Sequence, residues 1–182
     1  NFGLYFRFFG GDFKAFYRDH EVRFYIGIII AAVLLVTYDL MSHDVYMGVI
    51  DGVRFAAFQV VAIITTTGFG TADFDQWPGL SKVVILTLMF VGGCAGSTGG
   101  GIKVIRILVL AKSAALGTER VFRPHVVRAL RIGDTTVDED LRDAIHVYFI
   151  LIIGIFLACS LYMASLGLDI LTATTSVIAT LN

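Results

Sequence analysis

The sequence predicts an all-α membrane protein in which short re-entrant half-helices, extended segments and one broken helix accompany the helices that cross the bilayer. Of its 182 residues, 57% are apolar and only 16% are charged, against about a quarter in soluble domains. Its mean hydropathy is +0.81, and it has 19 glycines but only two prolines. This composition excludes disordered, collagenous and disulfide-scaffold proteins, and a net charge of −1 offers no basis for nucleic-acid binding.

Apolar stretches define the expected helices in chain order. After a cytoplasmic N-terminal segment at 1–23, a stretch that is uncharged over 24–38 and continues to Met41 predicts an outer helix over 24–41. A half-helix at 51–65 would be about 22 Å long, which is too short to span the bilayer. An uncharged run long enough to cross about 30 Å of hydrocarbon predicts a second outer helix at 144–167. A second half-helix is expected at 169–181.

The positions of the basic residues orient these helices. If the two half-helices only dip into the bilayer, one side of the membrane carries 12 of the 14 lysines and arginines, and the other carries only Arg54 and Lys82. The positive-inside rule makes the first side cytoplasmic. Aspartates gather on the outer side, where they either concentrate cations at a mouth or are simply tolerated.

The first half-helix runs into a segment at 65–70 that reads Thr-Thr-Thr-Gly-Phe-Gly and favours extended backbone. Non-helical backbone at membrane depth is tolerated only where it faces protein or a water-filled path. The order T-x-G-aromatic-G is that of K⁺ filters, in which a dehydrated ion satisfies the carbonyls. We therefore expect K⁺ at Thr66, Thr67 and Gly68, with Phe69 in the same filter. A threonine-capped helix end followed by a glycine turn is the plain structural alternative.

A glycine-rich stretch breaks the inner helix that is expected over 78–111. Six glycines lie within ten positions, and each costs about 1 kcal/mol relative to alanine in a helix. The break at 92–103 falls near mid-membrane, which predicts a flexible loop that obstructs a pore and moves aside when it opens. The candidate gate-loop residues are Gly92, Gly93, Gly96, Ser97, Thr98, Gly99, Gly100, Gly101 and Lys103.

The glycine-rich stretch also admits other interpretations. A phosphate-binding P-loop fails because Lys103 follows Ile102 and precedes Val104. An intramembrane serine hydrolase would need a His or Lys partner for Ser97 at membrane depth, and the nearby His146 is expected at the interface. Glycines at every fourth position also fit small-residue packing between helices. Lys103 either biases the cavity electrostatically or anchors the helix at the interface.

The remaining segments extend the pattern. A mixed-charge cytoplasmic linker at 112–143 either contacts a soluble partner or is merely solvated. The order of outer helix and half-helix recurs, so 24–111 is expected to be one complete membrane-pore-membrane repeat and 144–182 part of a second. Asn182 would lie at or just before the second filter segment, and the chain is expected to be a fragment of a longer protein.

Three motifs together resemble a known family. Thr65–Gly70, the stretch Gly92–Lys103 with its GSTGGGIK end, and the final Thr-Leu-Asn at 180–182 are similar to the Trk/Ktr/HKT superfamily of potassium transporters, and most of all to its bacterial TrkH-type subunits. The resemblance covers nearly the whole chain. It implies four membrane-pore-membrane repeats around a single pore, of which this chain would be the third and the start of the fourth.

The resemblance also implies a function and partners. K⁺ would be taken up across the bacterial inner membrane, with a filter at Thr66, Thr67, Gly68 and Phe69 together with Asn182, a gate at Gly92–Lys103, and no organic cofactor. The implied partners are membrane lipid, a second copy in a homodimer, and a cytosolic nucleotide-binding regulatory ring of the TrkA type. Two classes remain: a K⁺-conducting transport subunit, which is not an enzyme, and an intramembrane enzyme or nucleotide-binding membrane protein that uses the glycine-rich loop.

Overall fold

The computed structural model describes residues 3, 6, 9–11, 18–123, 129–133 and 135–182. Within these residues the chain is helical apart from its connecting segments and one two-stranded hairpin, as the all-α prediction required. The predicted segment 1–23 and linker 112–143 lie partly outside the described residues. In chain order the elements are α3 (His20–Ser42), α4 (Val49–Ile64), η1 (Phe74–Gln76), α5 (Gly79–Phe90), α6 (Val104–Phe122), β1 (Arg131–Ile132), β2 (Thr135–Thr136), α7 (Glu139–Ser165) and α8 (Ile170–Leu181).

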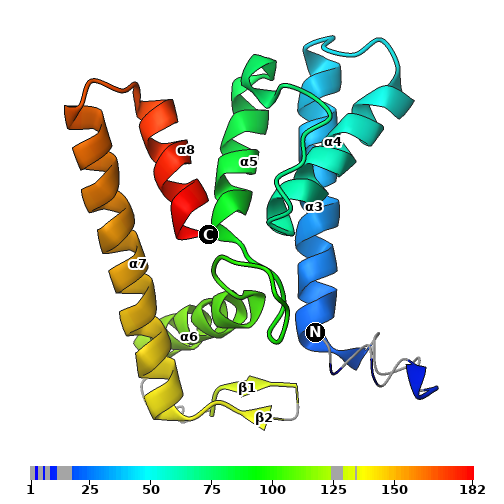
Figure 1. Cartoon of the computed structure of the whole chain (residues 1–182). Helices are drawn as coiled ribbons and strands as arrows, with labels where there is room; N and C mark the ends of the chain where they lie inside the picture. The colour runs from blue at the N-terminus through cyan, green and yellow to red at the C-terminus, as the bar shows by residue number, and fades with distance from the viewer. Residues whose placement is uncertain (1–2, 4–5, 7–8, 12–17, 124–128, 134) are drawn as a thin grey trace.

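Two long helices frame the molecule. Figure 1 shows α3 and α7 running along its two sides, with α5 and α8 between them and α4 crossing α3. The helices α4, α5 and α8 all end near mid-height, close to the segment that joins α5 to α6. At the lower end of the view lie α6, the β1–β2 hairpin and the start of α7. Three helix ends and one long connection therefore meet in the middle of the fold.

The core lies where α3, α4 and α5 pack together. Its residues on α3 and on α4 are spaced by four, which places one stripe of each helix against the other. In lipid this kind of association depends on close van der Waals packing rather than on the hydrophobic effect. The packing fixes where α4 ends relative to α3 and α5. The buried residues of this core are Ala32, Val36, Leu40, Ala56, Val60, Ile64, Trp77, Ile85 and Leu88.

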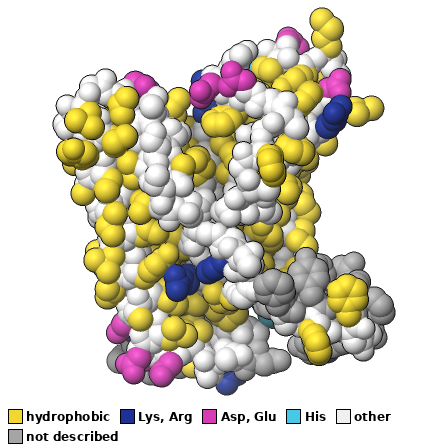
Figure 2. All heavy atoms as spheres, in the orientation of Figure 1, with side chains coloured by type: hydrophobic (Ala, Val, Ile, Leu, Met, Phe, Trp, Pro, Cys, Tyr) yellow, Lys and Arg dark blue, Asp and Glu magenta, His cyan; other side chains and the backbone are white. Residues whose placement is uncertain are grey.

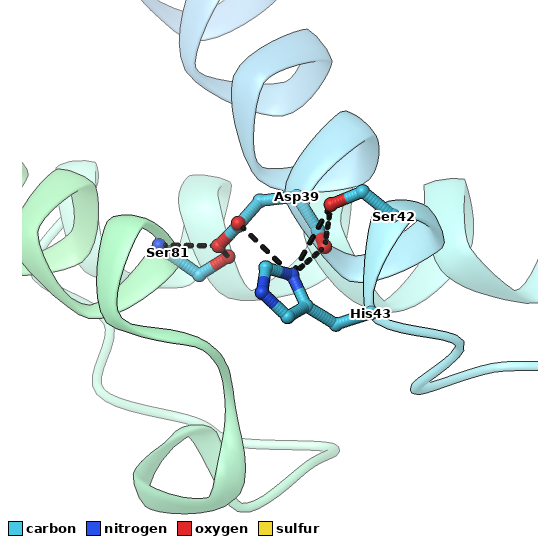
Figure 3. A network of polar contacts seen from close by, with 4 residues as sticks. All are labelled: Asp39, Ser42, His43 and Ser81. Atoms are coloured by element: carbon cyan, nitrogen blue, oxygen red, sulfur yellow. Dashed lines mark hydrogen bonds and ion pairs between the residues drawn. The ribbon is translucent and has the colours of Figure 1, made fainter.

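A buried carboxylate joins α3 to the start of α5 (Figure 3). Asp39 is 4% exposed, and its Oδ2 accepts hydrogen bonds from the Ser81 backbone N–H at 2.8 Å and from the Ser81 hydroxyl at 2.6 Å. Because α5 follows Pro78 and has no side-chain cap of its own, Asp39 satisfies a donor that a first helical turn leaves free. His43 Nδ1 lies 3.4 Å from the other carboxylate oxygen and 2.9 Å from the Asp39 carbonyl oxygen.

The outer helices begin earlier than the apolar stretches. The helix α3 starts at His20 rather than at 24, because the Asp19 carboxylate accepts hydrogen bonds from backbone N–H groups of the first turn. The helix α7 starts at Glu139 rather than at 144, because Asp138 caps it in a similar way. Both starts contain charged residues, which a hydropathy pattern excludes but which a capped, acidic first turn favours.

The inner helix is interrupted as expected but is longer beyond the break. Its first half, α5, ends at Phe90, and its second half, α6, begins at Val104 and continues to Phe122, past the expected end at 111. The additional stretch 112–122 contains no proline and a single glycine, so nothing in it ends the helix.

Hydrophobic side chains cover the flanks of the molecule. Among the helices of the described part, α3 and α7 are long and apolar enough to cross a membrane, judged by length and composition. In Figure 2 yellow side chains line the flank formed by α7, and acidic side chains gather toward the two ends of the view. The exposed apolar side chains of α7 include Val147, Ile150, Leu151, Ile153, Ile155, Leu157 and Leu161.

Candidate functional site: the segment after α4 and the glycine-rich loop

The segment that follows α4 uses its N–H groups and leaves its carbonyl oxygens without donors. The N–H groups of Thr66, Thr67 and Gly68 donate to carbonyls in the last turn of α4 over 2.9–3.3 Å. Within the part of the chain that the structure describes, no hydrogen bond is donated to the carbonyl oxygens of residues 66–70. These oxygens are therefore available to a ligand.

Two residues of this segment have a left-handed backbone. Thr66 has φ +56° and Gly68 has φ +75°. For threonine this conformation costs about 1–2 kcal/mol, and such strain is concentrated at functional sites. A hydroxyl pair reinforces the turn, since Thr65 Oγ1 donates to the Val61 carbonyl at 2.6 Å and lies 2.6 Å from Thr67 Oγ1. Because Thr65 uses its hydrogen on Val61, Thr67 donates to Thr65.

The glycine-rich stretch is a closed loop and not a helix. Backbone hydrogen bonds join its two ends, since the Gly92 N–H donates to the Ile102 carbonyl at 2.9 Å and the Ile102 N–H donates to the Phe90 carbonyl at 3.1 Å. None of residues 91–103 is helical. The glycines at every fourth position therefore do not share a helix face, and their interpretation as a packing stripe along a helix is wrong.

Three of these glycines occupy positions where a side chain would not fit. A Cβ atom on Gly92 would collide with the carbonyl oxygen of Gly100, and one on Gly100 would collide with the backbone of Asn182. Gly101 has φ +68°, and a Cβ atom there would collide with the side-chain oxygen of Asn182. The sequence is rich in glycine here because the loop folds tightly on itself and lies against the end of α8.

The loop also contacts the segment after α4. The Gly100 N–H donates to Thr66 Oγ1 at 3.3 Å, and a Cβ atom on Gly99 would lie 3.6 Å from the same oxygen. The structure thus brings Thr66, the loop and Asn182 together. The side chain of Phe69 is instead 71% exposed.

Lys103 turns back into the loop rather than outward. Its ammonium group donates to the carbonyl oxygens of Ser97, at 3.1 Å, and of Gly99, and it lies 3.5 Å from the Ser97 hydroxyl. Of the two alternatives for this lysine, anchoring at the membrane interface does not describe the observed contacts. The ammonium group instead holds two carbonyls of the loop.

Ser97 and Lys103 do not form a nucleophile and its base. The Ser97 hydroxyl donates to the Cys94 carbonyl at 2.7 Å, whereas a general base must accept the hydrogen of that hydroxyl. Lys103 donates its own hydrogens to carbonyls. His146 lies 3.3 Å from the Ser113 hydroxyl, on α6, and so serves a different serine. The geometry therefore does not favour the hydrolase interpretation.

Sequence reasoning missed two buried carboxylates of α3. Glu21 and Asp39 are 6% and 4% exposed, and each lies near one end of this long apolar helix. An ionisable residue in a membrane helix is costly and usually has a specific partner. That rule could have identified both residues, but their partners lie far away in the chain.

Comparison with known proteins gives the family. A family model described as TrkH, a cation transport protein, matches residues 11–182. The chain belongs to the TrkH family. One curated relative, the Trk system potassium uptake protein TrkH of Escherichia coli K12, is 38% identical over an alignment of 183 residues that covers 100% of this chain and 38% of that protein. The Trk system potassium uptake protein TrkG of the same strain is 27% identical over 169 residues, covering 93% of this chain and 35% of that protein.

A solved TrkH structure has the same fold. The crystal structure of the potassium transporter TrkH from Vibrio parahaemolyticus matches with a TM-score of 0.91 and 37% identity, over 99% of this chain and 39% of that chain. This confirms the resemblance to Trk transporters. These TrkH relatives are named as transport proteins and not as enzymes. The chain spans 38% of the length of the E. coli TrkH relative.

Proposed function

We propose that this chain is part of a K⁺ uptake protein of the bacterial inner membrane and forms one side of its ion path. One observation carries the proposal. The segment after α4 is not helical, follows a helix of 16 residues, and presents carbonyl oxygens that accept no hydrogen bond from the described residues. Membership of the TrkH family agrees with this function, since the relatives are named as potassium uptake proteins.

In this proposal α4 and α8 are re-entrant half-helices. Carbonyl oxygens of Thr66, Thr67, Gly68 and Phe69 replace the water lost by a K⁺ ion. The C-terminal end of α4 faces the ion path, and its partial negative charge favours a cation there. Asn182 occupies the equivalent place after α8, because α3–α4 and α7–α8 are two copies of one repeat.

The loop at Gly92–Lys103 is the gate. It lies against the filter residue Thr66 on one side and against Asn182 on the other. Backbone that is neither helical nor exposed to lipid is expected at membrane depth only where it lines a path or moves. The hydrogen bonds from Lys103 and the backbone hydrogen bonds between the two ends of the loop hold it in one compact conformation. In this conformation the loop obstructs the ion path.

Orientation and partners follow from the charge pattern and the resemblance. The 1–23 segment, the 112–143 linker and α6 face the cytoplasm, and the α3–α4 and α7–α8 connections face the other side. Lipid contacts the apolar flanks of α3 and α7. A homodimer and a TrkA-type nucleotide-binding ring complete the assembly, and the ring meets the cytoplasmic face.

Replacement of a filter glycine tests the function. In the intact protein, expressed in a bacterium that lacks K⁺ uptake, Gly68→Ala should reduce the preference for K⁺ over Na⁺ by about tenfold, because alanine resists the φ of +75° at this position and 1.4 kcal/mol corresponds to a factor of ten. Uptake of K⁺ and Na⁺ is measured in the same cells. Gly27→Ala is the matched control, because Gly27 lies in α3 and a Cβ atom there meets nothing within 4 Å.

Two results would contradict the assignment. An unchanged K⁺ preference in Gly68→Ala would remove the segment 65–70 from the ion path. An equal loss in Gly27→Ala would mean that the assay reports general damage to the protein. Protein amount in the membrane is measured for both variants, so that a loss of expression is not taken for a loss of selectivity.

A further inference from the structure

One carboxylate oxygen joins α3 to both ends of the loop. Glu21 is 6% exposed, and its Oε1 accepts hydrogen bonds from the Ala95 N–H at 2.7 Å and from the Ile105 N–H at 3.2 Å. Ala95 lies near the beginning of the loop, and Ile105 follows its end. A single side chain of α3 therefore binds the loop near its beginning, at Ala95, and binds α6 just after the loop ends, at Ile105.

The second half of the inner helix needs this partner. The residue at the N-cap of α6 is Lys103, and no side chain of its own caps the helix. Lysine has no acceptor for the N–H groups that a first helical turn leaves free. Glu21 supplies the missing acceptor to Ile105 from α3. A carboxylate at this end of a helix is also favoured by the helix dipole.

The same turn of α3 covers the beginning of the loop. Val22 is buried against Cys94, and Tyr25 packs on both. Cys94 is 8% exposed. Departure of the loop from its observed position would therefore uncover the Cys94 thiol, which makes this cysteine a native reporter of loop position.

We propose that Glu21 is a positioning residue that holds the loop in the ion path. The loop leaves this position only when Glu21 releases Ala95, or when the start of α3 moves together with the loop. The inference rests on the proposed function of the loop as a gate. It adds to that function a polar connection from the N-terminal end of the outer helix α3 to the obstructing segment.

Thiol labelling tests the proposal. In the intact protein, with Cys159 and every cysteine outside this chain replaced by alanine, Glu21→Ala should raise the rate at which a small water-soluble methanethiosulfonate labels Cys94 by about tenfold, which corresponds to 1.4 kcal/mol. Glu21→Gln should raise the rate less, because the amide oxygen still accepts a hydrogen bond. Asp19→Ala is the matched control, because Asp19 caps the same helix turn through Glu21 and Val22.

The outcomes separate this proposal from a general weakening of α3 and from the proposed function. Faster labelling in the Glu21 variants than in Asp19→Ala supports the connection. Equal rates in Glu21→Ala and Asp19→Ala, or an unchanged rate in both Glu21 variants, would overturn it. If the alanine variant does not fold, Glu21→Gln decides alone, and an unchanged rate overturns the proposal. An unchanged rate together with lost K⁺ preference in Gly68→Ala would refute the connection and leave the ion path standing.

Discussion

Removal of the Asp39 carboxylate should strongly destabilise the packing of α5 against α3. The two hydrogen bonds from Ser81 end on a buried carboxylate, and bonds to charged groups contribute about 1.5–3 kcal/mol each. Asp39→Ala leaves two buried donors of Ser81 unpaired. We therefore expect the free energy of unfolding to fall by about 3–5 kcal/mol. Asp39→Asn should cost less, since the amide oxygen can still accept both hydrogen bonds.

The assay is equilibrium unfolding of the purified intact protein by sodium dodecyl sulfate titration in detergent micelles. Asp51→Ala serves as control, because Asp51 is an exposed acidic residue in the first turn of α4 and should contribute less than about 1 kcal/mol. A double-mutant cycle with Ser81→Ala should give a coupling energy of about 1–2 kcal/mol. A loss in Asp39→Ala no larger than in Asp51→Ala, or a coupling energy near zero, would refute the reasoning.

Two further predictions concern the loop and the start of α8. Gly101→Ala should destabilise the loop by about 1–3 kcal/mol, because Gly101 has a φ of +68° and the added methyl group would collide with Asn182. K⁺ efflux from loaded cells should then rise. Unchanged efflux would contradict the role of the loop as a gate. Hydrogen bonds from Thr172 lower the pKa of Asp169 below its usual value of 3.8. The Asp169 cap therefore stabilises α8 fully above pH 3.8, and this stabilisation is lost as the pH falls through the lowered pKa. Amide exchange at Thr172, corrected for its intrinsic rate, should therefore accelerate at acid pH in the native protein, whereas equal acceleration in Asp169→Asn would exclude the carboxylate as the cause.

The local features of the fold could be predicted because their causes are local. A run of apolar residues, a glycine cluster and a T-x-G-aromatic-G order each act over a few turns of chain. They predicted helices close to the observed α3, α4, α7 and α8 and a break between α5 and α6. The errors lie at the ends of helices. The caps at Asp19 and Asp138 extend α3 and α7 into charged sequence, where a hydropathy pattern has no signal.

The sequence by itself determined where helices can form, which of them are too short to span a bilayer, and where the backbone must leave the helical conformation. Only the tertiary structure decided which side chains complete the starts of α5 and α6, which have no side-chain cap of their own. Ser81 lies 42 residues from Asp39, and Ile105 lies 84 residues from Glu21. The physical reason is that a free N–H group at a helix start specifies the need for an acceptor but not its source. That source depends on which helices pack together, and the packing of α3 against α4 and α5 is a property of the folded chain.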